Sequence, residues 1–373
     1  MKNKKKIYIV TTVHPWNDNR IYNKLVISSL KYKLNFCYVA TSIDNNKILS
    51  NINYLSIPVN KSRIKKIFWV LKKLIILKPS IFHFHDPELI PVGLILKMFC
   101  WKIIYDVHED NFLSQLQRNR PKYMNFIIAS SIRLLELIAK PFFKIVIAEK
   151  IYKKIFQNSI EVLNYPVLDR RNEKKNFKKG QLKITKNAIY SGLVSVDRGA
   201  GLFHNFLKSF KDYNLTVIGY CDKKETKELI LRTCKPYRKR LNLILSHKFI
   251  PFKKIQGFYK LKSWDFGLAI FPHTKHYEDK ILTKFYEYIN FEIPILCTNF
   301  KTWSKFIKKN NCGITINTNK NIDISLSTLY KKLDKNKKIQ LKKNCSLVSR
   351  KYSWDQEFIK ILKLYDEYSN NNS

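Results

Sequence analysis

The densest group of residues with chemical potential lies between residues 81 and 110, in the stretch IFHFHDPELIPVGLILKMFCWKIIYDVHED. It holds three of the chain's eight histidines, together with several carboxylates: His83, His85, His108, Asp86, Asp106, Glu109 and Asp110. His83 and His85 are two residues apart, so they share one face if this segment is a strand. This pair could begin a metal site, but the carboxylates lack the spacing of a recognised metal motif and supply no clear third ligand. The alternative is that these side chains line the rim of a ligand-binding cleft.

A second group lies in the segment YEDKILTKFYEYINFEIPILCTNF, residues 277–300. Lys284 precedes Glu287 by three residues, so the two side chains occupy neighbouring positions of one helix. A carboxylate can accept both hydroxyls of a ribose, and a lysine one turn earlier can reach a phosphate. Taken alone, however, the pair is more simply explained as a surface ion pair, which contributes roughly a few tenths of a kcal/mol. Asp279 is a further acid, eight residues before Glu287.

A third segment, YSGLVSVDRGAGLFHNFL, predicts a strand, a glycine-containing turn and a helix. Such a turn lets backbone N–H groups approach a phosphate, and the start of the helix favours negative charge. Arg198 lies at that start, where it could neutralise a diphosphate. The spacing matches neither a dinucleotide fingerprint nor a phosphate-binding P-loop, so Gly192 and Gly199 could also be ordinary turn residues.

The elements that position these residues alternate along the chain. Apolar runs bounded by turn residues predict strands at 6–12, 34–41, 80–85, 102–108 and 144–149, and again at 187–193, 215–220, 241–245, 264–271, 293–298 and 312–316. Helical patterns lie between them, at 20–32, 64–77, 88–99, 123–140, 199–211, 223–234, 282–290 and 301–309. This alternation predicts an α/β protein with two tandem doubly wound domains of parallel strands. Strand ends at His85 and His108 then fall on one edge of the first sheet, where such sheets bind ligands.

Composition narrows the class of protein. The chain of 373 residues is 45% hydrophobic and 14% aromatic, which is enough for two folded domains. Seventy Lys and Arg against 28 Asp and Glu give a net charge of +42, which attracts nucleic acid, anionic lipid or phosphorylated substrates, although compositional bias could also produce it. The seven cysteines include no C-x-x-C pair, so we expect neither a zinc ribbon nor a disulfide framework, and a reduced cytoplasm fits.

No uncharged run approaches the roughly 20 residues that are needed to span a bilayer. The segment NFIIASSIRLLELIAKPFFKIVIA, residues 125–148, carries Arg133, Glu136 and Lys140 within its apolar pattern. We interpret it as a helix buried against the sheet, and the alternative is an amphipathic helix at a membrane surface.

Six segments, taken in order, resemble the retaining GT-B glycosyltransferases of family four, which build capsules, exopolysaccharides and lipid-linked glycans. They are VHPWNDNRIYNK, HFHDPELIPVGLILK with KIIYDVHED, VLNYPVL, IYSGLVSVDRG, LTKFYEYINFEIPILCTNF and YSWDQEFIKILKLYDEYS. The resemblance extends over nearly the whole chain. It implies two Rossmann-like domains facing a central cleft: an acceptor-side domain at 1–168, a linker at 169–186, a donor-binding domain at 187–351, and a terminal helix at 352–373 that packs back on the first domain.

The resemblance also implies roles for individual residues. The implied catalytic residues are His108, Asp279 and Glu287. The implied donor-binding residues are Gly192, Arg198, Gly199, Lys284 and Glu287, and those on the acceptor side are Asp18, Arg20, His85, Asp86 and Glu109. Glu278, beside Asp279, is the alternative first acid of the family's paired-acid motif. Leu193 follows Gly192 where many members have an arginine, so either one cationic contact is missing or Arg198 supplies it.

The implied donor is a nucleotide-diphosphate sugar, and the implied acceptor is a glycan or a lipid-diphosphate-linked glycan, with no metal or other cofactor. An acceptor on a lipid diphosphate gives the positive charge a purpose, so we expect the protein on the cytoplasmic face of the cell membrane, on anionic lipid. A sugar-nucleotide epimerase of the same architecture is the alternative function. A nucleic-acid-binding protein fits less well, because the chain has no helix-turn-helix, zinc-finger or RNP-like motif and its charge is spread.

Overall fold

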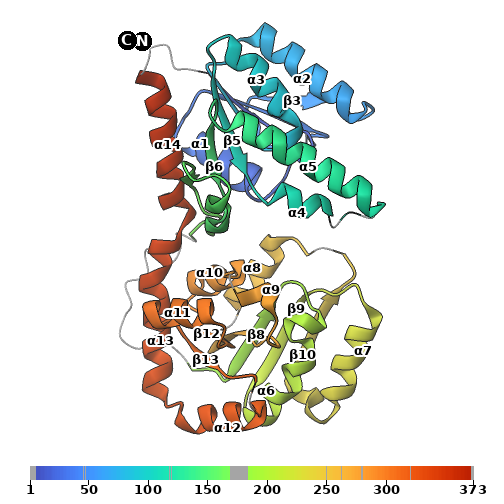
Figure 1. The fold of residues 1–373 in the computed structure, drawn as a ribbon. Helices are drawn as coiled ribbons and strands as arrows, with labels where there is room; N and C mark the ends of the chain where they lie inside the picture. The colour runs from blue at the N-terminus through green and yellow to red at the C-terminus, as the bar shows by residue number, and fades with distance from the viewer. Residues whose placement is uncertain are drawn as a thin grey trace. The chain divides into compact units, whose positions relative to one another are not determined.

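The computed structural model describes residues 6–44, 46, 48–116, 118, 120–168, 184–248, 250–261, 263–278, 280–319 and 321–370. The chain divides into two compact units (Figure 1). Unit 1 consists of residues 1–167 and 354–373, and unit 2 consists of residues 168–353. The C-terminal segment therefore belongs to the same unit as the N-terminus. Most of the linker predicted at 169–186 lies outside the described residues.

Unit 1 is built on a parallel sheet of seven strands in the order β3-β2-β1-β4-β5-β6-β7. The strands are β1 (Ile7–Val10), β2 (Phe36–Thr41), β3 (Tyr54–Ile57), β4 (Ile81–Phe84), β5 (Lys102–Val107), β6 (Lys144–Ile147) and β7 (Ile160–Glu161). The chain runs outward from β1 to one edge and then returns to β4, so the strand order reverses between β1 and β4. The loops after these two strands meet at the switch point, where doubly wound sheets bind ligands.

Helices cover both faces of this sheet. They are η1 (a π-helix, Ile21–Val26), α1 (Ile27–Lys31), α2 (Arg63–Leu77), η2 (Pro87–Leu89), α3 (Ile90–Met98), α4 (Asn111–Leu116), α5 (Lys122–Ala139), η3 (Lys150–Lys154) and α14 (Trp354–Asn370). Helices α2, α3 and α5 lie on one face, over a core that includes Val70, Leu74 and Leu96 (Figure 1). Helices η1 and α14 lie on the other face, where Leu25 and Trp354 are buried together.

Unit 2 has a parallel sheet of six strands in the order β10-β9-β8-β11-β12-β13, which reverses between β8 and β11. The strands are β8 (Asn187–Ser191), β9 (Asn214–Tyr220), β10 (Leu241–Ser246), β11 (Phe266–Ala269), β12 (Ile295–Thr298) and β13 (Gly313–Ile316). The helices are η5 (Val196–Arg198), η6 (Ala200–Leu202), α6 (Phe203–Ser209), α7 (Lys224–Thr233), η7 (Lys235–Arg240), α8 (Phe252–Leu261), α9 (Lys275–Glu278), α10 (Thr283–Asn290), α11 (Lys301–Asn310), α12 (Ile322–Lys332), α13 (Lys335–Ser349) and η8 (Arg350–Tyr352).

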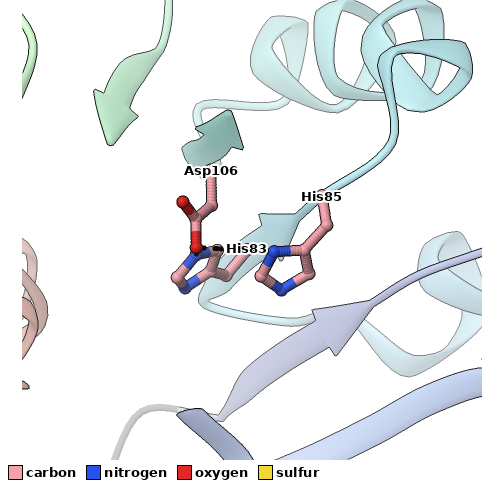
Figure 2. A group of neighbouring side chains, drawn as sticks. All are labelled: His83, His85 and Asp106. Atoms are coloured by element: carbon pink, nitrogen blue, oxygen red, sulfur yellow. Dashed lines mark ion pairs between the residues drawn. The ribbon is translucent and has the colours of Figure 1, made fainter. Parts of the chain in front are cut away.

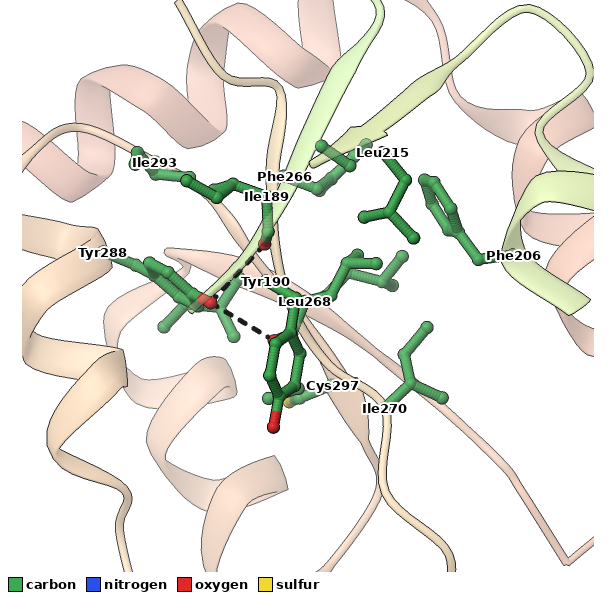
Figure 3. Close-up of a cluster of buried hydrophobic side chains, with 14 of the residues drawn as sticks. Ile189, Tyr190, Phe206, Leu215, Phe266, Leu268, Ile270, Tyr288, Ile293 and Cys297 are labelled. Atoms are coloured by element: carbon green, nitrogen blue, oxygen red, sulfur yellow. Dashed lines mark hydrogen bonds between the residues drawn. The ribbon is translucent and has the colours of Figure 1, made fainter. Parts of the chain in front are cut away.

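Helix α10 is held close to the centre of the second sheet by Tyr288. Its hydroxyl donates hydrogen bonds to the carbonyls of Ile189 and Leu268, each at 3.4 Å, which link the helix to β8 and β11 (Figure 3). This approach requires a glycine on β11, because a Cβ at Gly267 would lie 2.4 Å from the ring of Tyr288. The sheet therefore fixes the position of Lys284 and Glu287, which neighbour Tyr288 on α10.

The predicted fold class is confirmed, because both units are doubly wound α/β sheets and every strand predicted from an apolar run is present. The prediction missed elements with weaker patterns. Strand β3 is only partly buried, β7 has two residues, α12 has one fully buried side chain, Leu326, and α13 carries many lysines. Helix α13 nevertheless packs on the sheet, since Lys342 reaches Asp265, which is fully buried, at 2.8 Å.

We predict that Lys342→Met destabilises unit 2 by about 3–5 kcal/mol, because it leaves the buried carboxylate of Asp265 without its cation. In this variant Asp265 keeps hydrogen bonds from Lys186 N–H and from the Tyr213 hydroxyl, and these limit the loss of stability. Chemical unfolding measures the change. Lys343→Met is the matched control, since Lys343 is exposed on the same helix. Equal stability of the two variants would contradict the prediction.

Candidate functional site

The turn after β8 contains two glycines that other residues would replace poorly. Gly192 has φ +103°, and a Cβ built on it would meet nothing within 4 Å, so its backbone borders open space. Gly199 has φ +84°, and a Cβ there would lie 1.9 Å from the carbonyl oxygen of Ile270. The first glycine lets a ligand approach the main chain, and the second lets the turn pack against the segment after β11. Arg198 immediately precedes this contact.

Lys284 is buried, which corrects the interpretation of Lys284 and Glu287 as a surface ion pair. It is 7% exposed, its Nζ lies 3.8 Å from the centroid of the Tyr190 ring, and that nitrogen has no hydrogen-bond partner. The correction has a simple cause. Lys284 lies at the start of α10, on the face that carries buried Phe285 and Tyr288 against the sheet.

Three of the predicted donor-binding residues come together around Lys284. Burial lowers its pKa, the positive charge of Arg198 lowers it further, and the carboxylate of Glu287 partly offsets both, so the pKa is about 7. The Nε of Arg198 is also buried without a partner, and its guanidinium lies 5.9 Å from the Tyr277 ring. Two cationic side chains with unsatisfied N–H groups side by side form a site for an anion.

Glu287 is connected to the end of β8 through a hydrogen-bonded tyrosine. The hydroxyl of Tyr259 donates to Glu287 Oε2 at 2.9 Å and lies 2.6 Å from the Oγ of Ser191. Sequence analysis did not identify Tyr259, which comes from helix α8. Asp279 lies outside the described residues, and the neighbouring Glu278 is exposed at the end of α9. The described part of the site therefore places one held carboxylate beside two cations.

In unit 1, a buried aspartate organises the histidines. Arg20 donates two hydrogen bonds to Asp106, from Nη2 to Oδ1 at 2.8 Å and from Nε to Oδ2 at 3.1 Å. The same Oδ2 lies 3.5 Å from His85 Nδ1, 3.5 Å from His108 Nε2 and 3.9 Å from His83 Nε2. Figure 2 shows His83, His85 and Asp106 converging from two neighbouring strands. Pairing of β4 with β5 explains this, since His83 is in register with Ile104, two residues before Asp106.

These three residues also form a possible metal site, with ligand atoms within 4.8 Å of one another. Asp106 is the third ligand that sequence analysis did not identify; the register of the two strands could have shown it. A divalent cation would fit poorly here. Arg20 already occupies both oxygens of Asp106, and its fixed positive charge would repel the ion. The Nδ1 of His83 lies 2.7 Å from the hydroxyl of Tyr365, which leaves Nε2 as the ring nitrogen that faces Asp106.

His108 is the member of this cluster nearest to solvent. Its Nε2 lies 2.9 Å from Nδ1 of His85, which fixes the orientation of the ring. Burial lowers the pKa of His108 to about 4, although Asp106 works in the opposite direction. Neutral His108 can therefore present Nδ1 to a ligand near pH 7, as donor or acceptor according to its tautomer.

A second histidine–aspartate pair lies at the switch point of the first sheet and was not predicted. His14 Nδ1 lies 2.6 Å from Asp86 Oδ1, and the other oxygen of Asp86 accepts from Thr11 Oγ1 and Thr12 N. Burial opposes ionisation of Asp86, but these hydrogen bonds and the charge of His14 bring its pKa to about 2. For His14, the Asp86 carboxylate outweighs burial and raises the pKa. The spacing Thr-x-x-His after the first strand, at Thr11 and His14, was the sequence feature that could have indicated this pair.

The residues predicted for the acceptor side differ in how exposed they are. Arg20, His85 and Asp86 are buried and paired inside unit 1, so they shape the strand ends. Asp18 is half-buried and accepts hydrogen bonds from the backbone of Arg20 and Ile21, which starts helix η1. Glu109 is exposed and accepts from Ser114 Oγ at 3.0 Å.

We predict that Lys284→Met stabilises the free protein by about 1–4 kcal/mol near pH 6, because it removes a buried cation without a partner. The pKa of Lys284 is lower in the folded protein than in the unfolded chain, so its destabilising effect is complete below pH 7 and disappears as the pH rises through 10.5. Unfolding measured across this range should show a smaller rise in stability with pH for the variant. A loss of stability at pH 6 would contradict the prediction.

No protein family model and no curated protein sequence matches the chain. Solved structures do match it in fold. Sucrose-phosphate synthase from Thermosynechococcus elongatus is 12% identical with a TM-score of 0.60, and the match covers 97% of this chain and 98% of that one. HepE from Anabaena, in complex with UDP-glucose, is 10% identical with a TM-score of 0.64 over 97% and 100% of the two chains.

A third similar structure is WaaG, a glycosyltransferase involved in lipopolysaccharide biosynthesis, at 12% identity and a TM-score of 0.60 over 98% and 100% of the two chains. Each match spans both units. At this level of identity the likeness concerns the fold, and it confirms the expected arrangement of two Rossmann-like sheets that characterises GT-B glycosyltransferases.

Proposed function

We propose that this protein is a retaining glycosyltransferase that moves a sugar from a nucleotide-diphosphate donor to a glycan or lipid-diphosphate-linked acceptor in the synthesis of a surface polysaccharide. The observation that carries the proposal is the buried, unpartnered Lys284 beside Arg198 and Glu287. The fold supports it, since HepE, which shares the fold, was solved with UDP and with UDP-glucose.

The cationic site is suited to the departing diphosphate. When the bond between the sugar and the diphosphate breaks, negative charge grows on the phosphate oxygens. Arg198 and Lys284 are fixed in place before the reaction, so they stabilise this charge without rearranging. A bound diphosphate would also accept the hydrogen bonds that Lys284 Nζ and Arg198 Nε lack in the free protein. The main chain at Gly192, which borders open space, can approach the same phosphates.

The remaining roles follow from the resemblance of the sequence. We assign Glu287 to the ribose hydroxyls, with Tyr259 holding its carboxylate in place. We assign Asp279, or its neighbour Glu278, to the hydroxyls of the donor sugar, and neutral His108 to a hydrogen bond with the same sugar. No residue is proposed as a covalent nucleophile. The acceptor therefore attacks the anomeric carbon of the sugar on the face from which the diphosphate leaves.

We propose that the reaction needs no metal ion, because Arg198 and Lys284 supply the positive charge that a metal would provide. We also propose that the acceptor brings the protein to the inner face of the cell membrane, where its charge of +42 favours anionic lipid.

Donor binding provides the first test. We expect calorimetry with a panel of nucleotide sugars to find a ligand whose affinity falls at least tenfold in Lys284→Ala and in Glu287→Ala. Lys308→Ala is the matched control, because Lys308 is an exposed lysine on helix α11 of the same unit. Affinity unchanged in both site variants would remove the donor assignment.

Proton uptake gives a more specific test of Lys284. Its pKa of about 7 leaves it mostly neutral at pH 8, and a bound diphosphate should raise that pKa. We therefore expect uptake of about one proton per nucleotide sugar at pH 8, measured by calorimetry in buffers of different ionisation enthalpy. Lys284→Met should abolish the uptake, and an unchanged value would contradict the role of Lys284.

Turnover tests the reaction itself. We expect Lys284→Ala to lower the rate of transfer about 100- to 1,000-fold, and we expect transfer to continue in excess EDTA with the anomeric configuration retained. Nuclear magnetic resonance of the product measures that configuration. Conversion of the nucleotide sugar without any acceptor would instead identify an epimerase, and inverted product would contradict retention.

A further inference from the structure

Helix α5 is oriented with its large apolar side chains outward. Among its described residues, those that are buried are small or polar: Asn125, Ala129, Glu136 and Ala139. Most of its large apolar residues lie on the solvent side, where Tyr123, Phe126, Ile127, Leu134, Leu137 and Ile138 are exposed. Ile128, Ile132 and Leu135 are half-buried, and Leu135 packs against the core. Phe126, Ile127 and Leu134 each leave more than half of their surface exposed. A helix that only covered the core would have the opposite orientation.

A buried polar network holds α5 in this orientation. Glu136 Oε1 accepts hydrogen bonds from the hydroxyl of Tyr105 at 3.0 Å and from Asn111 Nδ2 at 2.8 Å. Its Oε2 accepts from Arg133 at 3.0 Å, and Arg133 also pairs with Asp110 at 2.6 Å. These contacts tie the polar face of the helix to β5 and α4. The outward direction of the apolar residues is therefore built into the fold.

The neighbouring helices continue the apolar surface. Helices α2, α3 and α5 cover the same face of the first sheet, with α3 packed against both of the others (Figure 1). Their exposed apolar residues are Ile64, Phe68, Ile75 and Ile76 on α2, Ile95 and Met98 on α3, and Phe142 just after α5. We call the outer side of these three helices the helical face. Exposed apolar surface of this extent marks an interaction site.

The charge of the helical face selects an anionic partner. A shallow pocket of about 420 Å³ on α2 is lined by Lys61, Lys65, Lys72 and Lys73 together with Phe68, Trp69 and Ile76. The sequence from residue 60 to 80 contains no acidic residue, and the only one on α5, Glu136, is buried. Lysines interleaved with aromatic and aliphatic side chains match the boundary between lipid phosphates and acyl chains.

We propose that the helical face docks on an anionic phospholipid bilayer, with the apolar residues of α5 and α2 inserted at the headgroup level and the lysines of α2 on lipid phosphates. Docking is peripheral, because no helix in the described part of the chain is long and apolar enough to span a membrane. This assigns a surface to the membrane location that the proposed function includes, but it does not depend on catalysis.

A second copy of the chain is a less suitable occupant. In a two-fold symmetric dimer the same patch meets itself, so the lysines of α2 would face the lysines of the partner. Like charges directly opposite each other oppose association. A bilayer that contains anionic lipid covers the apolar residues and neutralises the lysines together.

Vesicle sedimentation tests the proposal. We expect the full-length protein to bind vesicles of phosphatidylcholine mixed with phosphatidylglycerol, to bind phosphatidylcholine vesicles far more weakly, and to lose affinity as salt rises. The triple variant Phe126→Ser/Ile127→Ser/Leu134→Ser and the double variant Lys72→Glu/Lys73→Glu should each lose at least tenfold in affinity. Equal binding to both kinds of vesicle, or binding to neither, would overturn the proposal.

Matched controls separate the helical face from general charge and hydrophobicity. The control for the triple variant is Leu261→Ser/Ile324→Ser/Leu347→Ser, which removes equally exposed apolar residues from unit 2. The control for the double variant is Lys331→Glu/Lys335→Glu, on exposed lysines of unit 2. Both controls should bind like the unchanged protein, and an equal loss in the controls would overturn the assignment of the surface.

Two further measurements keep the alternatives distinct. We expect sedimentation equilibrium without lipid to show that the unchanged protein does not self-associate through the helical face. If the unchanged protein self-associates, the triple variant does not, and the two bind vesicles equally, the helical face covers a second copy of the chain and the proposal is wrong. Calorimetry with the nucleotide sugar should give the same affinity for the triple variant and the unchanged protein. Vesicle binding therefore tests the docking proposal and donor binding tests the proposed function, and either proposal can fail while the other holds.

Discussion

The candidate site of unit 2 depends on the free energy of burying one positive charge, the ammonium group of Lys284. Lys284 lies against the Tyr190 ring without a hydrogen-bond partner, and Arg198 adds a second positive charge nearby. A fold that buries such a group gives up stability in the free state, because desolvation and like-charge repulsion both oppose the ammonium ion. A bound anion would satisfy it. The rest of the site follows from this constraint: the glycines admit a ligand, and α10 is fixed to the sheet so that the lysine cannot move out to water.

The first unit treats its buried charges in the opposite way. Arg20 and Asp106 satisfy one another through two hydrogen bonds, and His14 and Asp86 form a second pair. These paired charges form a frame that orients His108, although Arg20 Nη1, His83 Nε2 and His85 Nε2 are buried there without a hydrogen-bond partner. Unit 2 therefore places two cationic side chains beside one carboxylate, whereas unit 1 pairs its buried charges and orients one neutral histidine. This division suits the proposed sugar transfer, because the leaving group develops charge while the sugar requires only orientation.

The sequence predicted what depends on local pattern and failed where distant contacts decide. Apolar runs predicted the strands, because buried parallel strands require them. The segment 282–290 was predicted as a helix, but the burial of Lys284 depends on how closely α10 approaches β11, which Gly267 and Tyr288 determine. Lys342 was missed for a similar reason, since nothing near it in the sequence indicates Asp265. Asp106 is intermediate between a local pattern and a distant contact. Its place beside the histidines follows from the register of two neighbouring strands, which the sequence analysis did not use.

Helix α5 shows most clearly why pattern alone leaves function open. Its periodicity predicts an apolar face and a polar face, and the usual assumption turns the apolar face to the core. Glu136 and Asn125 reverse that assumption, because their hydrogen bonds are made inside the unit and hold the polar face inward. The outward apolar face belongs to the same helical face as α2, whose basic residues have no acidic neighbour in sequence. On this face lysines lie among exposed apolar side chains, which is the combination that an anionic bilayer can cover.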